Sequence, residues 1–219
     1  MKLVLFDCDG TLVDGAGLIC ATMDATFAEH GLPLPPTKAT RNVIGRSLDL
    51  AIAELLPANA ASDVPHLVQR YKEHYHRMRL AGQYADPIYD GIAELIATLE
   101  MRDDVLLGIV TGKSRRGVAS VFAAHGFGDH FVTVRTADDC PSKPHPAMVW
   151  ECCSETGMEP ADTLVIGDTV YDMEMAVSAD ARAIGVDWGY GSVDALRRAG
   201  AEVVLSRPDQ LLTCLPEAV

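Results

Sequence analysis

Short apolar runs alternate with stretches of helical periodicity along most of this sequence. The first run, residues 3–6, places four strand-forming residues in succession, which is typical of a strand buried on both faces. Alternation of this kind predicts an α/β fold with a doubly wound, mostly parallel sheet and helices on both of its faces. The later apolar runs are residues 105–110, 164–166, 183–186 and 203–205, and a last helix is expected from about Asp209.

One long segment, residues 15–85, interrupts this alternation. Its apolar residues recur at helical spacing, and it contains no convincing strand pattern. An all-helical block inside an α/β pattern predicts a separate domain. We therefore expect a core made of residues 1–14 and 86–219, and an inserted helical cap domain made of residues 15–85. The helices of this cap are expected near residues 18–30, 48–56 and 67–82, with Pro33, Pro35 and Pro36 breaking the chain after the first of them.

Composition and charge narrow the class of protein. Of 219 residues, 48% are hydrophobic and 22% charged, which is ordinary for a soluble globular protein. The net charge of −13 argues against a nucleic-acid partner, because phosphate binding needs a basic face. The first apolar run is too short for a signal peptide, and no segment approaches the ~18 apolar residues of a membrane span. Six cysteines without C-x-x-C spacing indicate free thiols in a reducing compartment. We expect a cytoplasmic monomer or homodimer with no membrane partner.

Two carboxylates stand directly after the first strand, in Asp7-Cys8-Asp9-Gly10-Thr11. In an extended backbone the side chains of Asp7 and Asp9 project to the same side, so they are expected to face one cavity. Gly10 permits a sharp turn, whose backbone N–H groups are expected to face an anion. Two acids at the end of a buried strand are costly to desolvate unless a metal or another cation joins them. This motif therefore predicts a functional site.

Further polar residues follow other predicted strands. Thr111-Gly112 comes after residues 105–110, and Asp168 comes after residues 164–166. In parallel sheets, ligands bind beyond the carboxyl ends of the strands, so these residues are expected to meet Asp7. A hydroxyl and free N–H groups at Thr111-Gly112 suit a phosphate oxygen, although such a pair is also a common helix N-cap. The following basic residues, Lys113, Arg115 and Arg116, are expected to form a solvated turn.

Lys143 and Asp172 complete the set of candidates. The Lys143 ammonium would offset like charge among clustered carboxylates. Asp172 lies four residues after Asp168, so one helical turn can aim both acids at a single point. For Asp172 two interpretations remain open. It either orients Lys143 or a metal-bound water, or it caps a helix.

The segment from Asp7 to Thr11 resembles the D-x-D-G-T signature of the haloacid dehalogenase-like (HAD) hydrolases. Thr111, Lys143 and residues 167–172 match the family in order and spacing, so the resemblance spans nearly the whole chain. It implies a Rossmann-like core with a C1-type cap. It also implies that Asp7 is a nucleophile forming an aspartyl-phosphate, that Asp9 is the acid/base, and that Lys143 bridges the nucleophile and the phosphate.

By the same resemblance, Mg²⁺ would be held by Asp7, by the main-chain carbonyl of Asp9 and by Asp168, with Asp172 outside the first coordination sphere. In the cap, residues 44–48 resemble those of phosphoglycolate phosphatase-like members of subfamily IA. Arg46 is then expected to bind a substrate carboxylate or second phosphate, with a plain surface arginine as the alternative.

Other parts of the sequence are less specific. The cap is expected to join the core near residues 14–17 and 84–87. Members of the family commonly have serine after the Asp14 position, whereas this chain has Gly15. Trp188 and Tyr190 are expected either to line the entrance of the site or to pack as an aromatic loop.

A carboxylate at position 9 favours a phosphatase acting on a small phosphorylated metabolite. Dehalogenases have no equivalent of Asp9, whereas a β-phosphoglucomutase-like phosphotransferase retains both aspartates and remains an alternative, as does a pyrophosphatase. A non-catalytic regulatory or binding protein on the same scaffold is a further alternative. Retention of the whole acid and lysine set argues against it.

Overall fold

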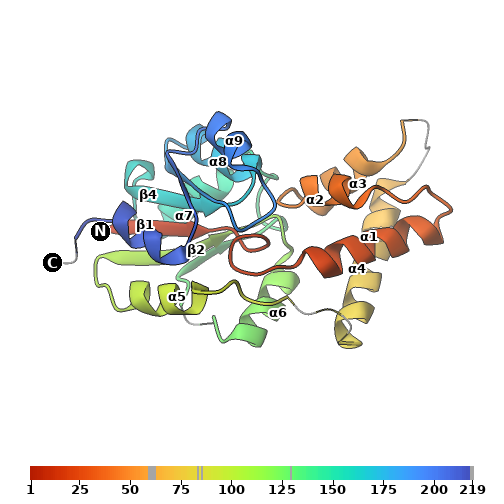
Figure 1. The fold of residues 1–219 in the computed structure, drawn as a ribbon, viewed down its shortest axis with the longest axis horizontal. Coiled ribbons are helices and arrows are strands. Elements are labelled where there is room, and N and C mark those ends of the chain that lie inside the picture. Colours follow the sequence, from red (N-terminus) through yellow and green to blue (C-terminus); the bar gives the residue numbers. More distant parts are fainter. Residues whose placement is uncertain (59–62, 83, 85, 129, 218–219) are drawn as a thin grey trace.

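A six-stranded parallel sheet forms the centre of the computed structural model, which describes residues 1–58, 63–82, 84, 86–128 and 130–217 (Figure 1). The strand order is β3-β2-β1-β4-β5-β6. This confirms the predicted α/β fold with a parallel sheet. The strands are β1 (Lys2–Phe6), β2 (Val105–Val110), β3 (Thr133–Arg135), β4 (Thr163–Gly167), β5 (Arg182–Val186) and β6 (Val203–Leu205).

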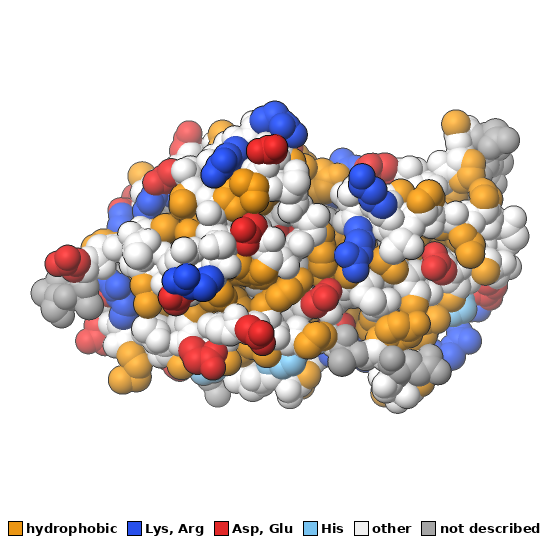
Figure 2. Space-filling model, in the orientation of Figure 1, with side chains coloured by type: hydrophobic (Ala, Val, Ile, Leu, Met, Phe, Trp, Pro, Cys, Tyr) orange, Lys and Arg blue, Asp and Glu red, His pale blue; other side chains and the backbone are white. Residues whose placement is uncertain are grey.

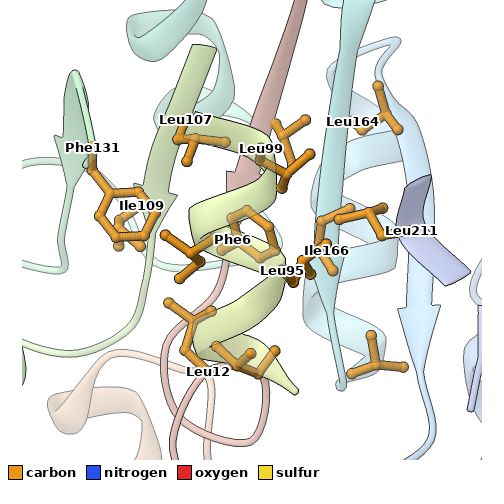
Figure 3. Packing of buried hydrophobic residues seen from close by; sticks show 14 of the residues in the cluster. Phe6, Leu12, Leu95, Leu99, Leu107, Ile109, Phe131, Leu164, Ile166 and Leu211 are labelled. Carbon is orange, nitrogen blue, oxygen red and sulfur yellow. The ribbon is translucent and has the colours of Figure 1, made fainter. Parts of the chain in front are cut away.

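Helices cover both faces of this sheet. Alternate residues of β1 point to opposite sides, so Phe6 packs with helix α5 and Leu5 belongs to the cluster that contains α7 and α8. Figure 3 shows Phe6 surrounded by side chains of α5, β2 and β4. Full burial of Phe6 anchors the end of β1, from which the first acidic motif emerges. The helices of this part are α5 (Ile92–Glu100), α6 (Arg115–His125), α7 (Ala147–Thr156), α8 (Val170–Ser178) and α9 (Val193–Arg198), with 3-10 helices η1 (Pro160–Asp162) and η2 (Pro208–Cys214).

Four further helices lie together beyond the carboxyl ends of β1 and β2 (Figure 1). They enclose a hydrophobic cluster of their own, which includes Met23, Phe27 and Ile52. Among the described residues between 15 and 85 there is no strand, as the sequence pattern predicted. These helices are α1 (Ala16–Glu29), α2 (Thr37–Asn42), α3 (Leu48–Leu55) and α4 (Val64–Leu80).

Two details differ from the sequence prediction. Helix α2 was not predicted, because the prolines before it were interpreted only as a break. Pro36 in fact stands at the N-cap of α2, where a proline costs no helical hydrogen bond. The helix expected from Asp209 is the 3-10 helix η2.

The chain crosses twice between the sheet and helices α1–α4, and the two crossings lie side by side. The Asp14 N–H donates to the Pro87 carbonyl at 2.8 Å, and Val13 forms an isolated bridge with Ile88. Ala85, part of the expected second link, lies outside the described residues. None of the helices in the described part of the chain has the length and apolarity needed to span a membrane.

Candidate active site

Three buried carboxylates meet at the carboxyl ends of neighbouring strands. Asp7 follows β1, Asp168 follows β4, and Asp172 lies in the first turn of α8. Because β1 and β4 are adjacent and parallel, the Asp7 N–H donates to the Ile166 carbonyl at 2.9 Å. Each of the three side chains offers an oxygen within 4.8 Å of those of the other two. The structure therefore brings together the acids that the sequence placed at strand ends.

Lys143 is a fully buried cation among these acids. Its Nζ donates to Asp7 Oδ1 at 2.7 Å and to Asp172 Oδ1 at 2.5 Å. Burial opposes the charged form, but the two carboxylates outweigh it and raise the pKa of Lys143, so it remains an ammonium. The other oxygen of Asp172 accepts hydrogen bonds from the N–H and hydroxyl of Thr169. Both interpretations of Asp172 thus apply, since one oxygen orients Lys143 and the other caps α8.

Asp168 is held by groups from distant parts of the chain. Its Oδ1 accepts from the Thr11 hydroxyl at 3.1 Å, and its Oδ2 accepts from the Tyr190 N–H at 2.7 Å. A β-carbon at Gly189 would lie 2.3 Å from that of Asp168, so only glycine permits this approach. The Trp188 indole donates to the Thr11 carbonyl at 3.1 Å. Trp188 and Tyr190 are thus held by hydrogen bonds to Thr11, Asp168 and Asp14, and neither lines the cavity described below.

The turn after Asp7 differs from its prediction at Gly10. The Gly10 N–H was expected to face an anion, but it donates to the Val13 carbonyl at 2.8 Å and closes the turn. Glycine is required at position 10 for a different reason. Its φ is +88°, and a β-carbon would lie 2.3 Å from Asp168 Oδ2.

The donor set fits a hard divalent cation. Within the part of the chain that the structure describes, three buried carboxylates share one ammonium, and Asp7 Oδ2 is buried without a hydrogen-bond partner. Burial raises the pKa of Asp7 to about 6 despite the opposing effect of Lys143. Burial, together with Asp172 and Asp7, raises the pKa of Asp168 well above its usual range. A cation of oxygen preference such as Mg²⁺ would relieve this excess of negative charge.

Asp9 is paired with Lys113, a residue that was expected to lie in a solvated turn. Lys113 Nζ lies 2.8 Å from Asp9 Oδ2, and only 7% of the Lys113 side chain is exposed. Burial opposes its charge, but Asp9 and Tyr75 raise the pKa of Lys113 well above its usual value. The expected solvated turn is therefore wrong for Lys113, whereas Arg115 is 73% exposed. The available signal was the position of Lys113 just past the end of β2, beside Thr111.

The shielding of Lys113 comes from helix α4. The Tyr75 hydroxyl lies 3.4 Å from Lys113 Nζ, and the centroid of the Tyr75 ring lies 5.7 Å from it. These two residues are 38 positions apart in the chain. The local sequence therefore gave no indication that the lysine is covered.

A cavity of about 530 Å³ lies between the strand ends and helices α1–α4. Asp7, Asp9 and residues 111–114 line it from the side of the sheet. Residues 43–49 and side chains of α1 and α4, including Tyr75, line it from the other side. On the face drawn in Figure 2, acidic and basic side chains are interspersed. The net charge of the chain is −13, so attraction of an anion depends on local cations such as Lys113 in the cavity wall.

Thr111 and Gly112 lie at the wall of this cavity. The Thr111 N–H donates to the Arg135 carbonyl at 3.0 Å, and Ser114, not Thr111, caps helix α6. A β-carbon at Gly112 would lie 2.5 Å from the Arg46 carbonyl oxygen, so residues 45–46 rest directly on Gly112.

Arg46 lines the cavity, but its charge is engaged elsewhere. Its guanidinium forms an ion pair with Glu54 and lies over the Tyr171 ring, 5.0 Å from the centroid. The next residue, Ser47, receives support from the core, since its N–H donates to Ser142 Oγ at 2.8 Å. The segment around Arg46 thus contacts the loop that carries Lys143.

Comparisons with known proteins show which family the chain resembles. The family model described as haloacid dehalogenase-like hydrolase matches residues 4–186. An N-acetylmuramic acid 6-phosphate phosphatase of Pseudomonas aeruginosa is 31% identical over 222 residues, covering 100% of this chain and 96% of that protein. A phosphoglycolate phosphatase of Haemophilus influenzae is 29% identical and covers 98% of each chain. The fold is similar to that of a Bacteroides fragilis protein described as a haloacid dehalogenase-like hydrolase, with a TM-score of 0.88 and 21% identity over 96% of this chain and 99% of that one.

Proposed function

The chain belongs to the haloacid dehalogenase-like hydrolases, and on that basis we propose that it is a Mg²⁺-dependent phosphatase of small phosphorylated metabolites. The observation that carries the proposal is the pair of carboxylates, Asp7 and Asp9, lining one cavity beside two buried ammonium groups. A phosphate ester bound there would meet a nucleophile, an acid/base and cations together.

Asp7 is proposed as the nucleophile. Lys143 holds Asp7 Oδ1, while Oδ2 lacks a partner and is available to attack phosphorus. Attack would form an aspartyl-phosphate and break the ester bond to the leaving oxygen. Asp9 would protonate that oxygen and then deprotonate the water that hydrolyses the intermediate.

Asp7, Asp168 and the main-chain carbonyl of Asp9 are proposed to hold Mg²⁺. When bound, the cation would offset negative charge on the phosphoryl group and the carboxylates. In this proposal Asp172 keeps Lys143 in place through its 2.5 Å hydrogen bond. Thr111 and Gly112, at the cavity wall, are proposed to contact a phosphate oxygen.

Residues 15–85 are proposed to act as a cap domain over a core made of residues 1–14 and 86–219. Their separate hydrophobic cluster and the two adjacent chain crossings support this division. A cap that closes over the bound substrate would keep bulk water away from the reacting groups. Such a closed site favours small metabolites over phosphoproteins.

A phosphate-release assay over a panel of metabolite phosphates tests the function. We expect release with Mg²⁺, little release in EDTA, and none from the Asp7→Asn variant. Absence of phosphate release from every ester would overturn the proposal. Conversion of a sugar phosphate without release of phosphate would instead identify a phosphotransferase.

A further inference from the structure

Lys113 is one of the two buried cations beside the cavity, but no step of the reaction proposed above is assigned to it. Its side chain is 7% exposed, and its ammonium pairs with Asp9 Oδ2 at 2.8 Å. An ammonium has three N–H donors, and the second neighbour, the Tyr75 hydroxyl, lies at a longer 3.4 Å. Burying a charge is costly, so a lysine placed here requires an explanation beyond one ion pair.

The position of Lys113 relates it to the leaving group. If the proposed function holds, Asp9 protonates the ester oxygen, and the substituent on that oxygen lies in the same part of the cavity. Lys113 borders this region, since both it and Asp9 line the cavity. A negatively charged group close to the ester oxygen would therefore meet the Lys113 ammonium.

Two of the arginines that line the cavity are paired with acids, and a third, Arg116, lies against the His76 ring. Arg46 is engaged by Glu54, and Arg79 by the buried Asp86. Lys113 also pairs with an acid, but that acid is the group proposed to act on the leaving oxygen. Lys113 would therefore both bind a substrate anion and contact Asp9, the group proposed to act on the leaving oxygen.

We propose that Lys113 is the specificity-determining residue of this site, which binds a carboxylate carried two or three bonds from the ester oxygen of the substrate. The inference rests on the proposed phosphatase function. Tyr75 shields the ammonium from the side of α4, so a bound carboxylate would interact with it away from bulk water.

Two substrates that differ only in this group provide the test. In 2-phosphoglycolate a carboxylate stands where ethyl phosphate has a methyl group. We expect the wild-type protein to prefer 2-phosphoglycolate by ~10–100-fold in kcat/KM, the usual worth of a charged hydrogen bond. In Lys113→Met the ratio of the two kcat/KM values should fall to about threefold or less, mainly because KM for 2-phosphoglycolate rises.

Control variants separate a loss of carboxylate recognition from a general loss of activity. Arg115→Met removes a positive charge two residues away, at an exposed side chain, and should keep the wild-type preference. Lys113→Arg preserves the charge with a different shape, and should change the preference at least about threefold. This variant decides the question if Lys113→Met does not fold.

Three outcomes would overturn the inference. The wild-type protein would show no preference for the carboxylate, Lys113→Met would lose both activities equally, or Lys113→Arg would keep the wild-type ratio. In each case phosphate release by the wild-type protein would leave the proposed function intact. Failure of the wild-type protein to hydrolyse any ester with Mg²⁺ would instead overturn the proposed function, and this inference with it.

Discussion

Replacing Asp168 by asparagine should stabilise the metal-free protein while abolishing its response to Mg²⁺. Asp168 lies within 4.8 Å of both Asp7 and Asp172, and these two acids share the single ammonium of Lys143. Asp168 therefore faces about one uncompensated negative charge. At that separation and an effective dielectric constant of about 20, one repulsion costs about 3.5 kcal/mol.

The amide can keep the hydrogen bonds of the carboxylate. Its oxygen can accept from the Tyr190 N–H and its NH₂ can donate to the Thr11 hydroxyl, in place of the two bonds that Asp168 accepts. Hydrogen bonds to a neutral group are weaker by about 1 kcal/mol. We therefore expect Asp168→Asn to raise the free energy of unfolding by about 1–3 kcal/mol in EDTA.

Urea unfolding followed by circular dichroism measures this difference in the free energy of unfolding. The dependence of the difference on pH tests whether its cause is electrostatic. The raised pKa of Asp168 means that the folded state binds this proton more tightly than the unfolded state. Stability of the wild-type protein therefore falls as pH rises through the region above the usual pKa of an aspartate. The advantage of Asp168→Asn should be small near about pH 5 and larger near about pH 8.

Magnesium and a surface control complete the experiment. Mg²⁺ at about 100 times its dissociation constant should stabilise the wild-type protein by about 2.7 kcal/mol, and the variant much less. Asp103→Asn, at an exposed position, should change stability by less than about 0.5 kcal/mol. A variant less stable than the wild type in EDTA at the higher pH, or equally stabilised by Mg²⁺, would refute the electrostatic reasoning.

Three further predictions concern activity. Asp7→Asn should abolish turnover, and Asp9→Asn should lose about 10²–10⁴-fold, as phosphate-release kinetics on folded variants can check. Ca²⁺ should fail to replace Mg²⁺, because its preference for more ligands would draw the free oxygen of Asp7 into coordination; equal rates with both ions would contradict this. Gly112→Ala should lower kcat/KM roughly 10–100-fold, because its β-carbon would lie 2.5 Å from the Arg46 carbonyl oxygen and push that segment away. Gly128→Ala, with open space around it, is the matched control.

The sequence was sufficient to predict the sheet and the meeting of Asp7 with Asp168. Both follow from local patterns, because apolar runs mark buried strands and the carboxyl ends of parallel strands share one edge. Lys143 was identified through the resemblance to the haloacid dehalogenase-like family, and the like charge of the clustered acids gives the physical reason for a cation at that place.

Contacts between distant segments were not predictable in this way. The burial of Lys113 depends on Tyr75, 38 residues earlier, and a run of basic residues gives no sign of such a cover. The engagement of Arg46 depends on the position of Glu54 one helix later. Gly10 was assigned correctly as a turn residue, but the acceptor of its N–H was set by the return of the chain at Val13.

Gly15 links the first crossing out of the sheet to the position of Asp9. It stands at the N-cap of α1, and a β-carbon there would lie 2.2 Å from Asp9 Oδ1. The present orientation of Asp9, paired with Lys113 through its other oxygen, therefore requires a residue without a side chain. The place where the chain leaves the sheet for helices α1–α4 thus also sets the direction of the carboxylate that faces the cavity.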